Sequence, residues 1–176
     1  MAAITTTTPR IPRIVEAQDS VTRPAGNTTQ YTEGDAISDN ATTPTAAGYF
    51  ALDLLATQGS VRITDLTLHK SDHDVTTATF WLLLFTVPPA FAGWEDNVAL
   101  AITDDEMKDC KAVITFPAAS WANVITGDVQ TVVPSTPIGI VTAAASSTIY
   151  GILVAGAAYT PADAEIFTLT VHASLD

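Results

Sequence analysis

The stretch TFWLLLFTVPP, residues 79 to 89, is apolar without a break from Phe80 to Phe85, in a chain of formal net charge -12. The ten residues from position 77 to 86 are all apolar or threonine, whereas a helix that crosses a bilayer needs about 20 residues. Aromatic and β-compatible side chains in so short a run predict a buried strand rather than a membrane span. Pro88 and Pro89 end the predicted strand, because proline cannot donate to a strand ladder.

Both faces of this predicted strand are apolar. Alternation places Phe80, Leu82 and Leu84 on one face. The other face carries Trp81, Leu83 and Phe85. In a two-layer sandwich one face packs on the opposite sheet, so the second needs cover from a loop, the N-terminal segment or a neighbouring subunit. Because closed symmetric oligomers are common, we predict these three residues at a subunit interface, of a homotrimer first and a dimer second.

The remainder of the chain contains short strand-like runs separated by turn signals. EIFTLTVHA, residues 165 to 173, alternates apolar and polar side chains as a half-buried strand does. SVRITDLTLH, residues 60 to 69, changes apolar parity between Ile63 and Leu66, which predicts a β-bulge near Thr64 and Asp65. TDDEMKDC, residues 103 to 110, has capping-box spacing and predicts a single helical turn. The whole pattern predicts an all-β fold, an antiparallel β-sandwich of jelly-roll type.

Residues 1 to 24 differ from the rest in composition and charge. ITTTTPRIPR, residues 4 to 13, is rich in threonine, and Pro9 and Pro12 disfavour helix at the residue before each. This segment has three arginines and two acids, net +1, which leaves -13 for residues 25 to 176. We therefore predict an extended N-terminal arm, residues 1–24, followed by an acidic sandwich domain, residues 25–176, although RIVEAQDSVT (13 to 22) also reads as a possible first strand.

Composition and motifs argue against several functions. With 7 Lys+Arg against 19 Asp+Glu, the chain is a poor partner for nucleic acid, because phosphate contacts need basic side chains. A Ser nucleophile in a G-x-S-x-G turn does not occur, so we expect no catalytic residue and no enzyme. The metal-like cluster HKSDHD contains imidazole and carboxylate groups, but a polar hairpin tip is the favoured interpretation, and we expect no metal or other cofactor. Its candidate ligands are His69, Asp72, His73 and Asp74.

Three longer segments carry a family resemblance. They are QYTEGDAISDNAT (30 to 42), DNVALAITDDEMKDCKAVITFP (96 to 117) and STIYGILVAGAAYTPADAEIFTLTVHASLD (147 to 176). Together they resemble small structural proteins of tailed bacteriophages that decorate, or cement, the capsid. The matching positions are Tyr31, Gly34, Asp35, Asp96, Asn97, Ala99, Tyr150, Gly151, Val154, Ala158, Tyr159, Thr160 and Pro161. The resemblance covers about the last five sixths of the chain, and Cys110 and the Thr-rich arm depart from it.

The resemblance implies a protein without chemistry that binds the outside of the major capsid protein lattice. Its location would be the exterior of the virion. The capsid-binding residues expected in the arm are Arg10, Ile11, Arg13 and Ile14. An acidic body suits the outer face of a shell, since it repels packaged DNA. The alternative function is a jelly-roll head or fibre module that binds host glycans through a loop aromatic such as Trp94.

Overall fold

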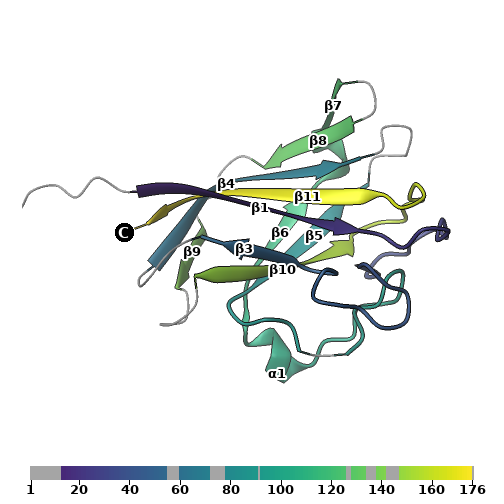
Figure 1. The fold of residues 1–176 in the computed structure, drawn as a ribbon, viewed down its shortest axis with the longest axis horizontal. Helices are drawn as coiled ribbons and strands as arrows, with labels where there is room; N and C mark the ends of the chain where they lie inside the picture. The colour runs from purple at the N-terminus through teal and green to yellow at the C-terminus, as the bar shows by residue number, and fades with distance from the viewer. Residues whose placement is uncertain are drawn as a thin grey trace, which may run out of the picture.

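The chain forms two antiparallel β-sheets packed face to face (Figure 1). The computed structural model describes residues 13–54, 60–71, 78–90, 92–125, 128–133, 138–141 and 147–175. The six-stranded sheet contains β1 (Arg13–Thr22), β11 (Ile166–Leu175), β4 (Ser60–Lys70), β8 (Asp128–Val133), β7 (Trp121–Ile125) and β9 (Ile138–Val141). The five-stranded sheet contains β2 (Ala36–Ile37), β3 (Phe50–Asp53), β10 (Thr148–Ala155), β5 (Phe80–Phe85) and β6 (Cys110–Phe116).

The strand order is that of a jelly roll. One sheet runs β1-β11-β4-β8 and the other runs β3-β10-β5-β6. In order of sequence these eight strands take positions 1-8-3-6 and 2-7-4-5, the arrangement of two interlocked Greek keys. β2 pairs with β10, β9 pairs with β4, and β7 extends the first sheet beyond β8. The predicted fold class is therefore confirmed.

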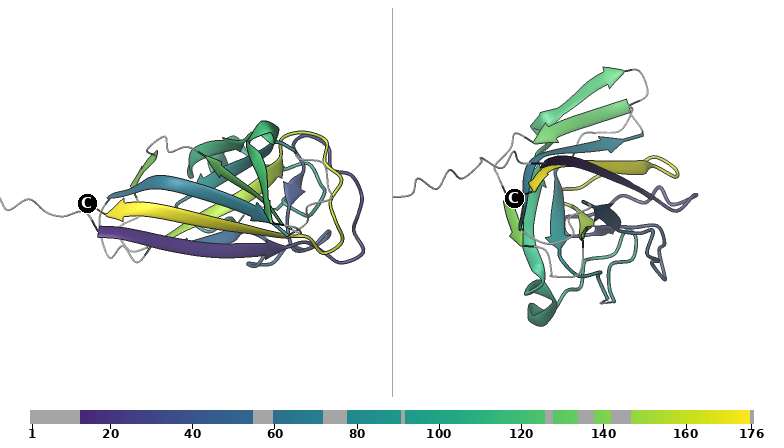
Figure 2. Two further views of the ribbon diagram at one scale, coloured as in Figure 1. Left: turned by 90° about the horizontal axis from the view of Figure 1, so that it is seen from above. Right: turned by 60° about the vertical axis from the view of Figure 1, so that its left-hand side comes forward.

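The first core lies between the two sheets, and β5 supplies three of its side chains. Phe80, Leu82 and Leu84 are fully buried there, as their shared parity predicted. The apolar side chains of β11 face them from the opposite sheet, while Thr168, Thr170 and His172 point outward and are half-buried. The two curved layers are seen edge-on in Figure 2.

The predicted irregularities also appear. In the pairing of β4 with β11, His172 is opposite Asp65 and Ala173 is opposite Ile63, so Thr64 is the extra residue of a bulge. The bulge reverses the parity of β4 and keeps the apolar residues on both sides of it buried. Helix α1 (Asp104–Met107) is the predicted single turn, and its N-cap Thr103 forms a capping box with Glu106.

The N-terminal segment is a strand of the sandwich from Arg13 onward, whereas the arm is predicted to extend to residue 24. Residues Arg13–Thr22 form β1, and all ten pair with β11. Val15 and Val21 are buried in the first core, and Arg23 is buried beyond the end of the strand. The burial of alternate apolar side chains makes this segment part of the sandwich. The arm would thus be confined to residues 1–12, which lie outside the described residues.

The outer face of β5 is covered largely by the chain itself. Leu83 and Phe85 are 6% and 1% exposed and form a second apolar cluster with Ile152 and Val154 of β10. The side chains that pack against this cluster are Tyr49, Trp81, Leu100, Ile102, Cys110 and Tyr150. Of the alternatives for covering this face, a loop is the one observed, because Leu100 and Ile102 belong to the connection before α1. A neighbouring subunit is not needed to bury Leu83 or Phe85, and Trp81 stays partly exposed.

Among the described residues, α1 and the short 3-10 turn Ala118–Ser120 are the helical elements. Neither is long and apolar enough to cross a membrane.

Candidate functional site

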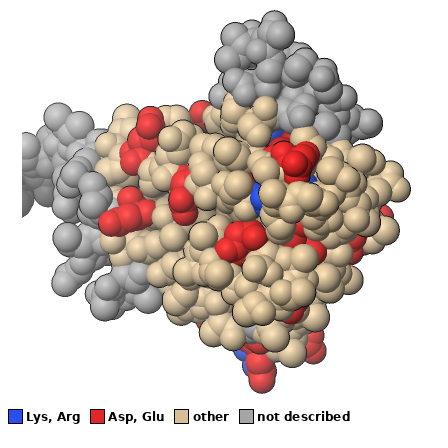
Figure 3. Space-filling view, turned by 45° about the vertical axis from the view of Figure 1, so that its right-hand side comes forward, with Lys and Arg blue, Asp and Glu red and all other residues tan. Residues whose placement is uncertain are grey.

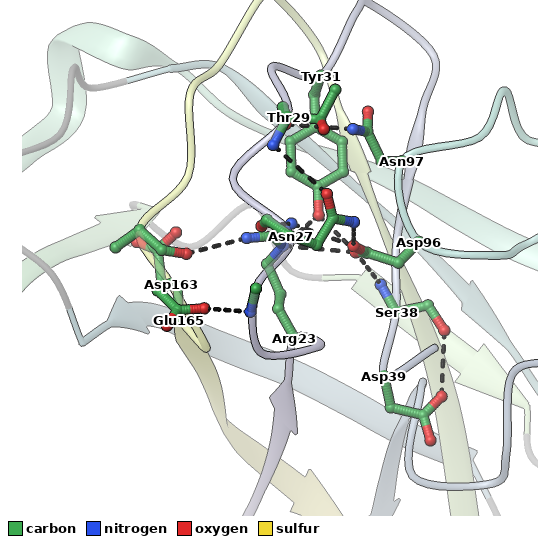
Figure 4. Close-up of polar contacts among 12 residues, drawn as sticks. Arg23, Asn27, Thr29, Tyr31, Ser38, Asp39, Asp96, Asn97, Asp163 and Glu165 are labelled. Carbon is green, nitrogen blue, oxygen red and sulfur yellow. Dashed lines mark hydrogen bonds and ion pairs between the residues drawn. The ribbon is translucent and has the colours of Figure 1, made fainter. Parts of the chain in front are cut away.

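The most elaborate polar arrangement of the described residues is a buried network where the loops meet at one end of the sandwich (Figure 4). Arg23 follows β1 directly and forms an ion pair with Asp96, with 3.1 Å between Nη2 and Oδ2. Neither side chain is exposed to solvent. Arg23 also donates to the carbonyl oxygens of Asn27 and Ala162, at 3.0 and 3.1 Å. One guanidinium therefore holds three separate loops.

Asp96 is the acceptor on which the network converges. The Asn27 amide donates to Oδ2 at 2.8 Å, and the Ser38 backbone N–H donates to Oδ1 at 3.2 Å. The Tyr31 hydroxyl donates to Oδ1 and accepts from Arg23 Nε. Figure 4 shows these groups pointing toward the carboxylate from different loops. The buried charge is thus paired and hydrogen-bonded, which is what the burial of a carboxylate requires.

A second buried ion pair belongs to the same end of the sandwich. Lys70 Nζ, at the end of β4, is 3.5 Å from Glu165 Oε1, with neither side chain exposed. The Tyr159 hydroxyl donates to the other oxygen of Glu165 and accepts from Lys70 at 3.4 Å. Lys70 Nζ also lies 5.2 Å from the centre of the Tyr159 ring. We call these three residues, together with Arg23, Asn27, Tyr31, Ser38 and Asp96, the loop network.

Tyr31 and Tyr159 join the two halves. Their rings stack at 6.1 Å, and each backbone N–H donates to the other's carbonyl, at 2.8 and 3.3 Å. Burial raises the pKa of both phenols, and the nearby carboxylates, Asp96 for Tyr31 and Glu165 for Tyr159, raise it further. Both hydroxyls are therefore protonated at neutral pH and can donate to these carboxylates.

The charged members respond to burial in different ways. Burial by itself disfavours the charged guanidinium, but Tyr31 and Asp96 outweigh it and raise the pKa of Arg23 above its ordinary value. Burial also raises the pKa of Glu165, although the Tyr159 hydroxyl and Lys70 act in the opposite direction. Glu165 Oε1 has Lys70 as an ion-pair partner but accepts no hydrogen bond. Glu165 is therefore the carboxylate of the network that is least well compensated.

The three segments that carry the family resemblance meet beside this network, although Tyr150 and Gly151 lie farther along β10. Gly34 N–H donates to Ala155 at 2.8 Å and its carbonyl accepts from Leu100 at 2.9 Å, which ties the three motif segments together. Asp35 and Ala99 pair through their backbones in an isolated antiparallel β-bridge. Gly34 and Asn97 have φ of 95° and 61°, left-handed conformations that glycine and asparagine tolerate. The motifs therefore specify the loop structure at this end of the fold.

Chemically, the loop network is suited to holding loops rather than to catalysis. Its ionisable groups are buried and turned toward one another, and the two hollows described on the surface are lined by other residues. In the part of the chain that the structure describes, no three His, Cys, Asp or Glu side chains are grouped so that they could hold a metal ion. Of the metal-like HKSDHD cluster, His69 is a β4 residue, while Asp72, His73 and Asp74 lie outside the described residues.

The other predicted site residues lie away from the network. Arg10 and Ile11 fall outside the described residues, whereas Arg13 and Ile14 begin β1. The Ile14 side chain is 76% exposed. Trp94, the loop aromatic predicted to stack on a glycan, is 7% exposed and packs against Tyr49 with ring centres 5.4 Å apart. This leaves little of the Trp94 ring for stacking on a sugar, so the structure gives the glycan-binding alternative no support.

Comparisons with known proteins place the chain in no family. No family model matches it, and no curated protein matches it. Among solved structures, it is similar to a chain of desmodium yellow mottle tymovirus, with 12% identity over 99% of this chain and 93% of that one, at a TM-score of 0.31. It is similar to a chain of the Kashmir bee virus empty particle, with 14% identity, 97% and 93% coverage and a TM-score of 0.33. The pentamer of Israel acute paralysis virus gives 10% identity, 93% and 88% coverage and 0.33. Similarity this low does not bear on function, and the fold assignment rests on the strand order.

The sequence analysis does not predict the burial of Arg23, Lys70 or Glu165. It places Arg23 in the arm, Lys70 in the polar hairpin tip HKSDHD, and Glu165 at the start of the last predicted strand. The available signal was the spacing of the resemblance motifs, since Tyr31, Asp96 and Tyr159 all belong to them. Polar and tyrosine residues in three separate motifs do not by themselves predict one shared polar network. That prediction also needs the knowledge that the three loops meet in the fold.

Proposed function

We propose that the chain is a structural protein of a virion that binds the outer surface of the major capsid protein lattice and stabilises the head. This is the role of the decoration or cement proteins of tailed bacteriophages that its motifs resemble. The observation that carries the proposal is the meeting of the three motif segments in and around one buried network. Scattered matches of single residues would be expected by chance, whereas matches that share one structural centre favour a common fold.

The surface charge supports an exterior position. Acidic side chains are spread over the face seen in Figure 3, and basic side chains occupy little of it. Two of the basic residues, Arg23 and Lys70, are buried in ion pairs. Such a surface repels nucleic acid and favours contact with a complementary basic surface.

The start of β1 is the proposed contact with the lattice. β1 lies at the end of its sheet, with β11 on one side and none of the described strands paired on the other. The Ala51 N–H donates to Asp19 at 2.6 Å and closes the later part of this edge, which leaves the part around Arg13 and Ile14 open. An open strand edge beside an exposed isoleucine suits the addition of a partner strand. We place Arg13 and Ile14 in this contact.

Self-association is also part of the proposal, with a homotrimer first and a dimer second. The second apolar cluster supports self-association less than the apolar sequence of β5 suggested, because Leu83 and Phe85 are buried within one subunit. Trp81, half-buried at the edge of that cluster, remains the candidate from this face.

The test is co-sedimentation of the purified protein with capsids that lack it. Binding and a higher melting temperature of the capsid are expected. Ile14→Asp should abolish binding, while Ile166→Asp is the matched control, because Ile166 is 38% exposed at the opposite end of the neighbouring strand. Absence of binding by the unaltered protein would refute the function. Equal binding by both variants would refute the contact at Ile14 but not the proposed function.

A further inference from the structure

A surface groove next to α1 has an apolar floor and an acidic rim. Two hollows, one of 350 Å³, meet at Pro89 and Ala90. The apolar lining includes Phe85, Pro88 and Trp94. Glu95 lines one hollow, and Glu106 and Asp109 line the other. We call the surface formed by these residues the proline groove.

The acidic residues of the rim have capacity for a positive partner. Asp109 is exposed, and its Oδ1 lies 3.9 Å from Lys111 Nζ, with both side chains reaching solvent. Glu106 caps α1 through one oxygen, Oε2, which accepts from the backbone and hydroxyl of Thr103 at 2.7 Å. An apolar, aromatic-lined groove with acids at its edge is suited to an extended, proline-rich, basic peptide.

The chain contains one such peptide. Residues 9 to 12 read Pro-Arg-Ile-Pro, a P-x-x-P sequence that favours the polyproline II conformation. Arg10 and Arg13 are the sole charged residues among the first fifteen. A sequence that favours polyproline II loses less conformational entropy on binding than a flexible one. The charge and the proline content of this segment therefore suit the proline groove.

The segment precedes a strand that lies away from the groove of its own subunit. Pro9 precedes Arg13 by four residues and so lies at most about 14 Å from it. Arg13 begins β1 at the edge of the six-stranded sheet. The groove is lined by Phe85 at the end of β5 and by Glu106 of α1, and β10 and β3 lie between β5 and β1. Figure 1 shows α1 beyond the five-stranded sheet, away from β1. We therefore assign the occupant to another molecule.

We propose that Pro9–Pro12 of a second copy of this chain lies in the proline groove, with Arg10 facing the acidic rim. The contact is heterologous if it closes as a ring of three, and the interface is isologous if two copies exchange their segments in a dimer. It goes beyond the proposed function, because it joins copies of the chain whether or not they bind a capsid. It leaves Arg13 and Ile14 available for the lattice.

The test is the oligomeric state of the full chain by sedimentation velocity over a range of concentrations. The unaltered chain is expected to self-associate at micromolar concentration. Arg10→Glu should weaken association about tenfold, since it turns attraction at the rim into repulsion. Arg62→Glu is the matched control, because Arg62 is exposed on β4 in the other sheet. Asp109→Lys should weaken association similarly, and combining it with Arg10→Glu should restore it.

Asp105→Lys is the control for Asp109→Lys, because Asp105 is exposed on α1 and does not line the groove. A chain that stays monomeric, or self-association that none of these changes alters, would overturn the proposal. Loss of association in both single variants without recovery in the double variant would also count against it. Capsid binding, tested with Ile14→Asp, can fail without affecting these results.

Cys110 provides a second readout, because it is the single cysteine and is next to Asp109 in the chain. Ile11→Cys should form a disulfide between two chains under mild oxidation, visible as a dimer on a non-reducing gel. Ser20→Cys, exposed on the outer face of β1, should form much less. Equal dimer from both variants, or dimer that persists when Cys110 is replaced by serine, would contradict the proposed position of the segment.

Discussion

Arg23 and Asp96 are 73 positions apart in the sequence and form an ion pair of 3.1 Å from which solvent is excluded. Removing two charges from water costs much of what their attraction returns, so such a pair adds little net stability. It does impose a strict condition, because either charge alone would be buried without compensation. The pair therefore selects the loop arrangement in which all its hydrogen bonds are made.

Removal of one partner tests this relationship. Asp96→Ala is expected to lower the free energy of unfolding by about 3–5 kcal/mol, because it strands the Arg23 guanidinium. Urea denaturation would measure the loss. Asp105→Ala is the control, since Asp105 is exposed in its ion pair with Lys108, and its effect should stay within about 0.5 kcal/mol. Similar losses in both variants would show that the network does not constrain the fold.

Glu165 should make stability depend on pH. Burial raises its pKa above the ordinary value of 4.5. Between the ordinary pKa of the unfolded state and the raised pKa of the folded state, the folded protein holds the proton and the unfolded chain does not. The free energy of unfolding therefore rises as pH falls through this window. Relative to Glu165→Gln, the unaltered protein should therefore gain stability as pH is lowered from neutral toward 4.5. Denaturation of both proteins at several pH values would measure it, and a constant difference would contradict the raised pKa.

Gly48 should not tolerate a side chain. A Cβ at this position would lie 2.4 Å from Asp39 Oδ1 and from Ser38 Oγ, and 2.8 Å from the Trp94 ring. Gly48→Ala is expected to cost about 1–3 kcal/mol through overpacking. The exposed Ala46, changed to serine, is the control in the same loop. Thermal unfolding would separate them, and a tolerated alanine would mean that the Asp39 loop can shift.

The second apolar cluster should stabilise the single subunit. Leu83→Ala is expected to lower the free energy of unfolding by about 2–5 kcal/mol, because Leu83 is buried within the chain. Val113, its partner on β6, is 57% exposed, so Val113→Ala should cost much less. Urea denaturation at a protein concentration where the chain is monomeric would measure both. A loss for Leu83→Ala that appears only in the oligomer would assign this face to a subunit interface instead.

Two N-terminal truncations should differ sharply. Removal of residues 1–12 leaves β1 and Arg23 in place, so cooperative unfolding should persist. Removal of residues 1–24 deletes a strand paired along its whole length and one half of the buried ion pair, and the chain should not fold. Circular dichroism with thermal melting distinguishes the two results. Folding of the shorter chain would restore the predicted boundary at residue 24.

The local pattern carried much of the fold. The apolar run at Phe80–Phe85 predicted a strand buried on both faces, and the parity change in residues 60 to 69 predicted the bulge at Thr64. These predictions succeed because burial, side-chain alternation and strand breaking depend on neighbours within a few positions. The pattern did not predict whether a loop or a neighbouring subunit covers the outer face of β5, because both bury an apolar side chain equally well.

The sequence alone determined the strands, the turns, the jelly-roll class and the acidity of this protein, because each depends on residue type and short-range spacing. Only the tertiary structure decided that Arg13–Thr22 is a strand of the sandwich, that Trp94 is buried, and that two ion pairs meet between the loops. A sequence does not distinguish a charged residue that is buried in an ion pair from one that is exposed to solvent. Their partners are fixed by chain segments far apart in sequence, which come together only when the two sheets close.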